Sequence, residues 1–312
     1  MLARDVAAAA QLACLLEVSA PKPGNVSPAR HFRDARFEDF LASAVAIGEP
    51  FAGVGGRPLG ATIRQAVEAT RRWTRSNTNL GIVLLLAPLA RAAVSGSDPG
   101  SDPGPDPGPD PGSDPGRRLR VGVQRVLQAT TVDDARDVYA AIRLAQPGGL
   151  GSADAQDVAG EPTVTLLDAM RLAAERDGVA REYATGFETT FGVGAPALHD
   201  ARCAGLPWND AIVETFLRLL AAAPDTHIVR RGGAESAQDV SRRARAVLDA
   251  GGVRSTHGRR ALDQMDAALR DPRNTANPGT TADLTAAAIF VELLTTKMPG
   301  YGGGCDGGST KR

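Results

Sequence analysis

Apolar residues recur every three or four positions through most of this 312-residue chain. The stretch near the C-terminus is typical, because Leu284, Ala287, Val291 and Leu294 fall on one side of a helix. This is the period of an α-helix, and no set of segments shows the strict alternation that a sheet requires. We therefore expect an all-α fold, a single-domain multi-helix bundle of about a dozen helices.

The composition fits closely packed helices and disfavours several classes of protein. Apolar residues make up 43% of the chain but aromatic residues only 4%, so the core is mainly Ala, Leu and Val. The net charge of −1 argues against nucleic acid as a partner. No apolar run approaches the roughly 18 residues of a membrane span. The three cysteines, Cys14, Cys203 and Cys305, form no disulfide framework or zinc motif, which indicates a reducing, cytoplasmic location.

Residues 97–116 form a four-residue repeat of Asp, Pro and Gly that has nothing to bury. We interpret this stretch as a low-complexity surface insertion between two helices, within one catalytic domain over 1–296. The glycine-rich stretch 297–312 is expected to be a disordered tail.

A polar loop in the middle of the chain is the first candidate site. It carries Asp154, Gln156 and Asp157, and we expect a helix to follow from Glu161 and Pro162, because proline suits a first helical turn. Carboxylates held at the start of a buried helix could bind Mg²⁺ or a ribose. An ordinary polar loop with a capped helix is the alternative.

Other loops carry polar residues at predicted helix starts. Lys22 stands between two prolines on a stiff turn, although an incidental lysine in a helix connection is the alternative. Asn77 and Asn79 precede an apolar helix, either as an anion site or as a plain cap. Asn277 with Pro278 suits a cap of the last helix.

Four motifs together resemble one family, the triphosphoribosyl-dephospho-CoA synthases. They are Pro21-Lys22-Pro23-Gly24-Asn25, Asn77-Thr78-x-x-Gly81, Asp225-Thr226 with Arg230, and Asn277-Pro278-Gly279-Thr-Thr-Ala-Asp283-Leu284. The resemblance covers nearly the whole chain outside 97–116 and the tail. Members of the family commonly read Asn-Thr-His-Lys-Gly where this chain has Asn77 to Gly81, so we identify it as a divergent branch.

The resemblance implies an enzyme that transfers the triphosphoribosyl group of ATP to 3′-dephospho-CoA and releases adenine. The product would be the precursor of a prosthetic group, and Mg²⁺ is expected with ATP. Both substrates are small molecules.

Such a reaction develops positive charge on the ribose, which a carboxylate stabilises. On this basis Asp157 and Glu161 are candidates to hold Mg²⁺ or face the ribose, and Asp34 is a further catalytic carboxylate. The residues assigned to ATP binding are Lys22, Asn25, Asn77, Asn79, Arg230, Asn277 and Asp283. For Asn277 and Asp283 a purely structural capping role is the strongest alternative.

Two other functions stay open from the sequence. An all-α, Mg-dependent hydrolase of N-glycosidic or ADP-ribosyl bonds would use similar carboxylates, and the same transfer could act on a different nucleotide or acceptor. A non-catalytic helical partner protein is the third interpretation, and it would not bind ATP.

Overall fold

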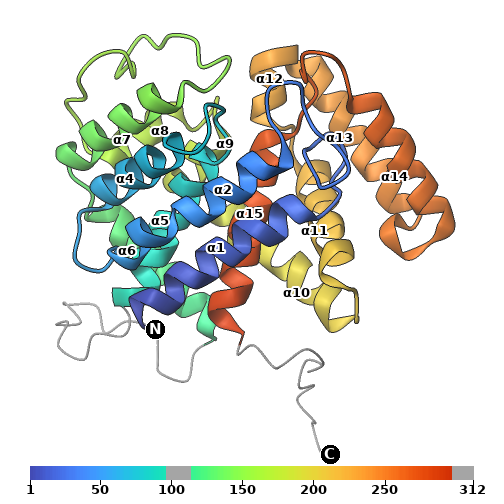
Figure 1. Cartoon of the computed structure of the whole chain (residues 1–312), viewed down its shortest axis with the longest axis horizontal. Coiled ribbons are helices and arrows are strands. Elements are labelled where there is room, and N and C mark those ends of the chain that lie inside the picture. The colour runs from blue at the N-terminus through green and yellow to red at the C-terminus, as the bar shows by residue number, and fades with distance from the viewer. Residues whose placement is uncertain (96–113, 297–312) are drawn as a thin grey trace, which may run out of the picture.

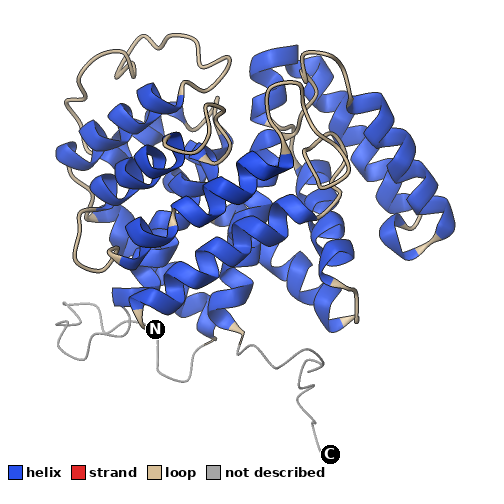
Figure 2. Cartoon of the chain, in the orientation of Figure 1, coloured by secondary structure: helices blue, strands red, loops and turns tan. Residues whose placement is uncertain are grey.

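The computed structural model describes residues 1–95 and 114–296, which form helices α1 to α15 and contain no strand (Figure 2). The expected all-α fold is confirmed. None of the helices in this described part is long and apolar enough to cross a membrane. The predicted insertion, apart from residues 114–116, and the predicted tail lie outside the described residues.

The helices of the N-terminal half run from α1 to α7. Their bounds are α1 Ala3–Ser19, α2 Phe37–Ala46, α3 Gly48–Ala52, α4 Leu59–Arg71, α5 Leu80–Ser95, α6 Pro115–Gln128 and α7 Val132–Ala145. Asp114 caps α6 by accepting a hydrogen bond from the Arg117 N–H at 3.0 Å, so the last residues of the predicted insertion belong to a helix start.

The second half holds shorter helices followed by long ones. Their bounds are α8 Leu166–Ala173, α9 Gly178–Thr185, α10 Ala195–Cys203, α11 Trp208–Ala222, α12 Thr226–Gly232, α13 Ala234–Asp249, α14 Thr256–Leu269 and α15 Gly279–Thr295. A π-helical turn, Thr190–Gly194, precedes α10, and a 3₁₀ turn, Gly252–Arg254, precedes α14.

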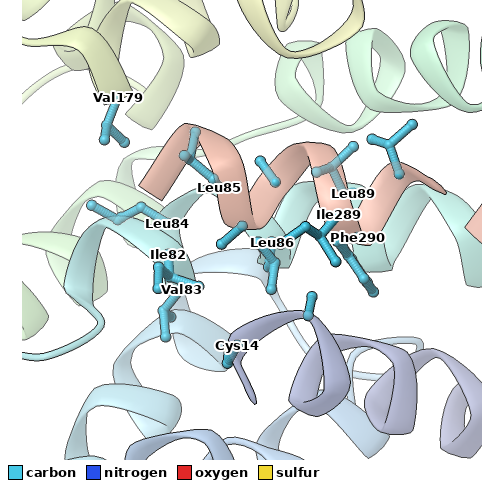
Figure 3. Packing of buried hydrophobic residues seen from close by; sticks show 14 of the residues in the cluster. Cys14, Ile82, Val83, Leu84, Leu85, Leu86, Leu89, Val179, Ile289 and Phe290 are labelled. Atoms are coloured by element: carbon cyan, nitrogen blue, oxygen red, sulfur yellow. The ribbon is translucent and has the colours of Figure 1, made fainter. Parts of the chain in front are cut away.

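Helix α15 crosses the middle of the molecule (Figure 1). It packs against α1, α5 and α11, while α4, α6 and α7 lie on one side of it and α13 and α14 on the other. Helices α5 and α15 bury residues on all their faces, as expected for helices that are apolar all round. Figure 3 shows Leu86 of α5, Phe290 of α15 and Cys14 of α1 gathered in this core.

The prediction that a helix begins at Glu161 and Pro162 is wrong. Helix α8 begins at Leu166 instead, because the Thr165 hydroxyl accepts the Asp168 N–H at 3.2 Å and caps it there. Proline is compatible with a first helical turn but does not by itself start a helix. A capping hydroxyl stabilises the start directly, because it accepts a hydrogen bond from a backbone N–H that has no partner in the helix.

Asp225 joins the starts of two helices that are far apart in the sequence. One carboxylate oxygen accepts the N–H groups of His227 and Ile228 at the start of α12. The other accepts both the N–H and the hydroxyl of Thr281, in the first turn of α15, at 2.7 Å each. This buried carboxylate therefore fixes α12 against α15.

We predict that Asp225→Asn lowers the free energy of unfolding by about 2–4 kcal/mol, because an amide nitrogen cannot accept the Thr281 donors. Urea unfolding would measure this loss. Asp249→Asn removes the same charge from an exposed helix end and should change stability by less than about 0.5 kcal/mol. Equal effects from the two substitutions would contradict the clamp.

Candidate functional site

A cavity of about 510 Å³ opens between the starts of several helices. Its walls come from α5, α7, α8, α9, α12 and α15 and from the loop 146–165. The apolar part includes Leu84, Val138, Ile142, Leu166 and Met170. Such a lining, with a few polar groups at one end, is typical of a small-molecule site.

The N-terminal turns of three helices form part of the cavity wall. They are those of α5, α9 and α15. The Asn77 side chain accepts the Leu80 N–H at 3.2 Å, and Asp177 caps α9 through the Ala180 N–H at 3.0 Å. The N-terminus of a helix presents backbone N–H groups and a partial positive charge. Three such ends favour an anionic ligand.

Two arginines add full positive charge to the wall. Arg230 of α12 forms an ion pair with Asp177, and its side chain is 20% exposed. Arg176 is exposed and donates a hydrogen bond to the Ser152 carbonyl at 3.2 Å. Because Arg230 already has a carboxylate partner, an anionic ligand would compete with Asp177 for its guanidinium.

Asp283 of α15 places its carboxyl group directly over the backbone of Gly81. A Cβ atom at Gly81 would lie 2.0 Å from the Asp283 Oδ2 atom, so only glycine leaves room there. Burial raises the pKa of Asp283 well above its ordinary value, and the charges of Glu17, Asp225 and Asp177 raise it further against the opposing effect of Arg230. The cavity therefore holds a carboxyl group that is a stronger proton acceptor, when ionised, than an exposed aspartate.

His227 lines the cavity between Arg230 and α15. Burial, together with the charges of Arg230 and Arg231, lowers the pKa of His227 to about 4. The imidazole is therefore neutral near pH 7. Its Nε2 atom is buried and has no hydrogen-bond partner among the described residues, which leaves it available to a ligand.

The loop 146–165 forms the roof of the cavity, and helix side chains hold its backbone. The Tyr139 hydroxyl donates to the Gln156 carbonyl at 2.6 Å, and Arg143 donates to the Val158 carbonyl at 2.8 Å. Gln156 adopts a left-handed backbone (φ 51°), and its side chain bonds both polar groups of Thr163. The roof is thus an ordered part of the cavity wall.

Of the residues assigned from the sequence, the structure brings Asn77, Arg230 and Asp283 to the cavity. Asp34 is exposed and does not line it. Asp157 accepts the N–H groups of Ala159 and Ala153 within its own loop, and these bonds lower its pKa.

Asp157 and Glu161, the predicted metal pair, do not line the cavity. The Glu161 side chain is 74% exposed and lies 3.9 Å from Arg143. No group of three or more His, Cys, Asp or Glu side chains converges into a metal-binding cluster anywhere in residues 1–95 and 114–296. These residues do not fit a magnesium site built by the protein alone.

Lys22, Asn25, Asn79 and Asn277 lie outside the cavity lining. Lys22 is 1% exposed, and its ammonium group forms an ion pair with Glu17 at 2.9 Å. Asn79 donates to the Thr70 hydroxyl at 3.0 Å. Asn277 does not cap α15 through its side chain; it accepts a hydrogen bond from Asn25 at 2.6 Å. In this structure the four residues hold segments of the chain together.

Sequence reasoning missed Asp177, Arg176, His227 and Gly81. Asp177 carried a local signal, because an aspartate directly before a helical stretch is a preferred cap. His227 lies inside a motif that was already singled out, but only its burial beside two arginines makes it unusual. The importance of Gly81 depends on Asp283, which is two hundred residues away in the chain.

The chain matches a protein-family model described as ATP:dephospho-CoA triphosphoribosyl transferase over residues 3–300. A relative from Pseudomonas syringae pv. tomato, named "Probable 2-(5''-triphosphoribosyl)-3'-dephosphocoenzyme-A synthase", is 39% identical over 116 residues. That match covers 37% of this chain and 39% of the relative. A relative of the same name from Stutzerimonas stutzeri is 38% identical over 117 residues, or 40% of its length. The chain thus spans about two fifths of the length of the curated relatives it matches.

A solved structure gives a longer match. It is a crystal structure from Archaeoglobus fulgidus, described as a candidate triphosphoribosyl-dephospho-CoA synthase. The match has a TM-score of 0.59 and 26% sequence identity, and it covers 82% of this chain and 98% of the other. The likeness therefore includes the fold as well as short motifs.

We predict that Lys22→Met lowers the free energy of unfolding by about 3–5 kcal/mol, because it leaves the buried Glu17 carboxylate without a partner. The double variant Glu17→Gln, Lys22→Met should recover much of this loss. Arg64→Met, which breaks solvent-accessible ion pairs with Glu68 and Asp137, should cost about 1 kcal/mol or less. A Lys22→Met protein of normal stability but weaker ATP binding would instead support the phosphate role assigned from the sequence.

The lowered pKa of His227 predicts a loss of stability in acid. A neutral histidine in the folded state contributes stability above pH 6.5, and this contribution is lost as the pH falls toward 4, because only the unfolded chain takes up the proton. We expect this one group to account for about 2 kcal/mol between pH 7.5 and pH 5. His227→Gln should lose that much less than the wild type in urea unfolding at the two pH values, whereas His257→Gln, at an exposed position, should behave as the wild type. Identical losses in wild type and His227→Gln would refute the assignment.

Proposed function

This chain belongs to the ATP:dephospho-CoA triphosphoribosyl transferase family, and on that basis we propose that it transfers the triphosphoribosyl group of ATP to the ribose 2′-hydroxyl of 3′-dephospho-CoA, with release of adenine. The observation that carries the proposal is the composition of one cavity. Helix N-termini and two arginines meet three carboxyl groups, those of Asp154, Asp177 and Asp283, and an apolar wall there. A triphosphate, a reacting ribose and a purine need these three environments side by side.

The triphosphate is not cleaved in the reaction, so contacts with it can position ATP in the cavity. The N-terminal turns of α5, α9 and α15 would contact its oxygens, and Arg230 and Arg176 would supply the positive charge. The apolar residues of α5, α7 and α8 would then enclose the adenine.

In the chemical step the bond between N9 of adenine and the ribose C1′ breaks; adenine leaves with the electron pair and takes up one proton, which balances the proton that the acceptor hydroxyl loses. The acceptor oxygen forms the new bond to C1′ and gives up its proton. The ring carries positive charge between these events, which a nearby carboxylate stabilises. We assign this stabilising role to Asp177.

Asp283 is our candidate to accept the proton of the attacking hydroxyl. A general base is most effective when its pKa lies near the working pH, and the surroundings of Asp283 move its pKa in that direction. The neutral His227 would hydrogen-bond the ligand through its unpartnered Nε2 atom. Both side chains are fixed by the Asp225 clamp.

Magnesium is expected to arrive bound to the phosphates of ATP. Mg²⁺ commonly takes only one or two protein carboxylates together with substrate phosphates. Because the described residues form no metal cluster of their own, we derive no step through the ion.

Free adenine released from ATP and Mg²⁺, with and without 3′-dephospho-CoA, is the decisive measurement. We expect release only when the acceptor is present. Release without acceptor would indicate a hydrolase of the N-glycosidic bond. No release under either condition would contradict the proposed substrates.

We predict that Asp283→Asn lowers kcat by at least about 100-fold, by removing the base, yet makes the protein more stable at pH 8. A raised carboxyl pKa means that folding favours the protonated form, so the stability associated with Asp283 is lost as the pH rises through its folded pKa. The advantage of the variant over the wild type in thermal unfolding should therefore shrink as the pH falls toward 4.

Gly81→Ala provides a second test of the same base. The added methyl group would force the Asp283 carboxyl aside, so activity should fall although alanine favours a helix. Gly122→Ala in α6, where the new Cβ would lie 3.2 Å from that of Ala92, is the matched control. Full activity in Gly81→Ala would exclude a positioned Asp283.

A further inference from the structure

Arg72 and Arg75 flank Trp73 in the loop between α4 and α5, and the loop between α1 and α2 carries three further arginines. The Trp73 residue is 70% exposed, the most of any large apolar residue in the described part of the chain. The residues of this cluster, which we call the arginine–tryptophan surface, are Arg30, Arg33, Arg36, Arg72, Trp73 and Arg75, and all are exposed.

Hydrogen bonds hold the two loops together. The Ser76 hydroxyl donates to the Asp34 carbonyl, and the hydroxyls of Ser43 and Thr78 bond to each other. The loops that carry the arginines therefore meet at Asp34 and Ser76, although forty residues separate them in the sequence.

The positive charge of this surface is largely uncompensated. Among the described residues, Arg30 has a carboxylate within 4.0 Å, that of Asp266 at 3.9 Å, and the other four arginines have none. Asp34 is the one acidic residue in 28–36 and 72–76. Unpaired guanidinium groups beside an exposed indole suit a ligand that combines phosphate with an aromatic base.

The Trp73 loop leads along the chain to the cavity wall. Asn77 lines the cavity and follows Trp73 by four residues, which places the two at most about 14 Å apart. A ligand held on Trp73 can therefore extend to the cavity mouth.

The size of the cavity requires a second binding area. About 510 Å³ is the volume of a pocket for one drug-sized ligand. The proposed reaction joins two nucleotides, one of which carries a further long arm, so most of the acceptor must lie outside the cavity. The arginine–tryptophan surface adjoins the mouth and has the matching chemistry.

We propose that this surface binds the adenosine diphosphate half of the acceptor 3′-dephospho-CoA, an inference that rests on the proposed function. The adenine stacks on Trp73 and the arginines contact the diphosphate. The acceptor ribose then lies at the mouth near Asn77, where its 2′-hydroxyl faces the triphosphoribosyl donor. Single-stranded nucleic acid uses the same contacts, but one tryptophan and a chain of net charge −1 favour a single nucleotide.

Fluorescence of Trp73 tests the inference without turnover. The chain has two tryptophans, so Trp208→Phe leaves Trp73 as the single reporter. Titration with 3′-dephospho-CoA in the absence of ATP should quench it saturably. Removing Arg72 and Arg75 together (both to Ala) should weaken binding about tenfold, and added salt should weaken it as well. Arg260→Ala, at an exposed position where no carboxylate of residues 1–95 or 114–296 lies within 4.0 Å, should leave binding unchanged.

Kinetics give a second measurement in the otherwise unaltered chain. Trp73→Ala should raise KM for 3′-dephospho-CoA about tenfold, with KM for ATP and kcat unchanged. The inference is overturned if 3′-dephospho-CoA does not quench Trp73, if ATP quenches it equally well, or if a single-stranded oligonucleotide binds more tightly. Quenching without adenine release would support acceptor binding at this surface and reject the proposed reaction. Normal turnover with an unchanged KM in Trp73→Ala would support the reaction and reject binding at this surface.

Discussion

The site depends on the Asp225 carboxylate, which is buried and accepts four hydrogen bonds from the first turns of α12 and α15. Burial alone raises the pKa of Asp225, while its four donors oppose that effect. The residues that the clamp positions come from both helices, with His227 and Arg230 on α12 and Asp283 on α15. The buried hydrogen bonds of Asp225 thus set the relative positions of the cavity residues on α12 and α15.

Acidic groups are concentrated around Asp283 at a cost in stability. Glu17, Asp177 and Asp225 all raise the pKa of Asp283, and Arg230 opposes them. Lys22 lies outside the cavity lining and pairs with Glu17. Its buried ammonium group also donates to the carbonyls of Glu17 and Ala20. Like charges placed close together are common at sites where a protein needs a group with an altered pKa.

The arrangement separates the two proposed substrates. The enclosed cavity, with its helix N-termini and apolar wall, suits the donor, whose triphosphate and adenine need opposite surroundings. The open surface around Trp73 suits the acceptor, which is longer and needs to reach the reacting carbon with one hydroxyl only. The roof loop stands over the donor cavity and is held by Tyr139 and Arg143 of α7.

The sequence by itself determined the helices, several of their caps and the family. Helical spacing and capping residues are local: Thr131 and Asp134, only three residues apart, form the capping box at the start of α7. Tertiary structure alone decided which polar side chains meet. Lys22 and Asp283 look alike as charged residues beside predicted helices, but packing encloses the first in an ion pair and places the second against Gly81 in the cavity. Periodicity records which face of a helix is buried, whereas a site is formed by residues from different helices, and their meeting depends on contacts between segments far apart in the chain.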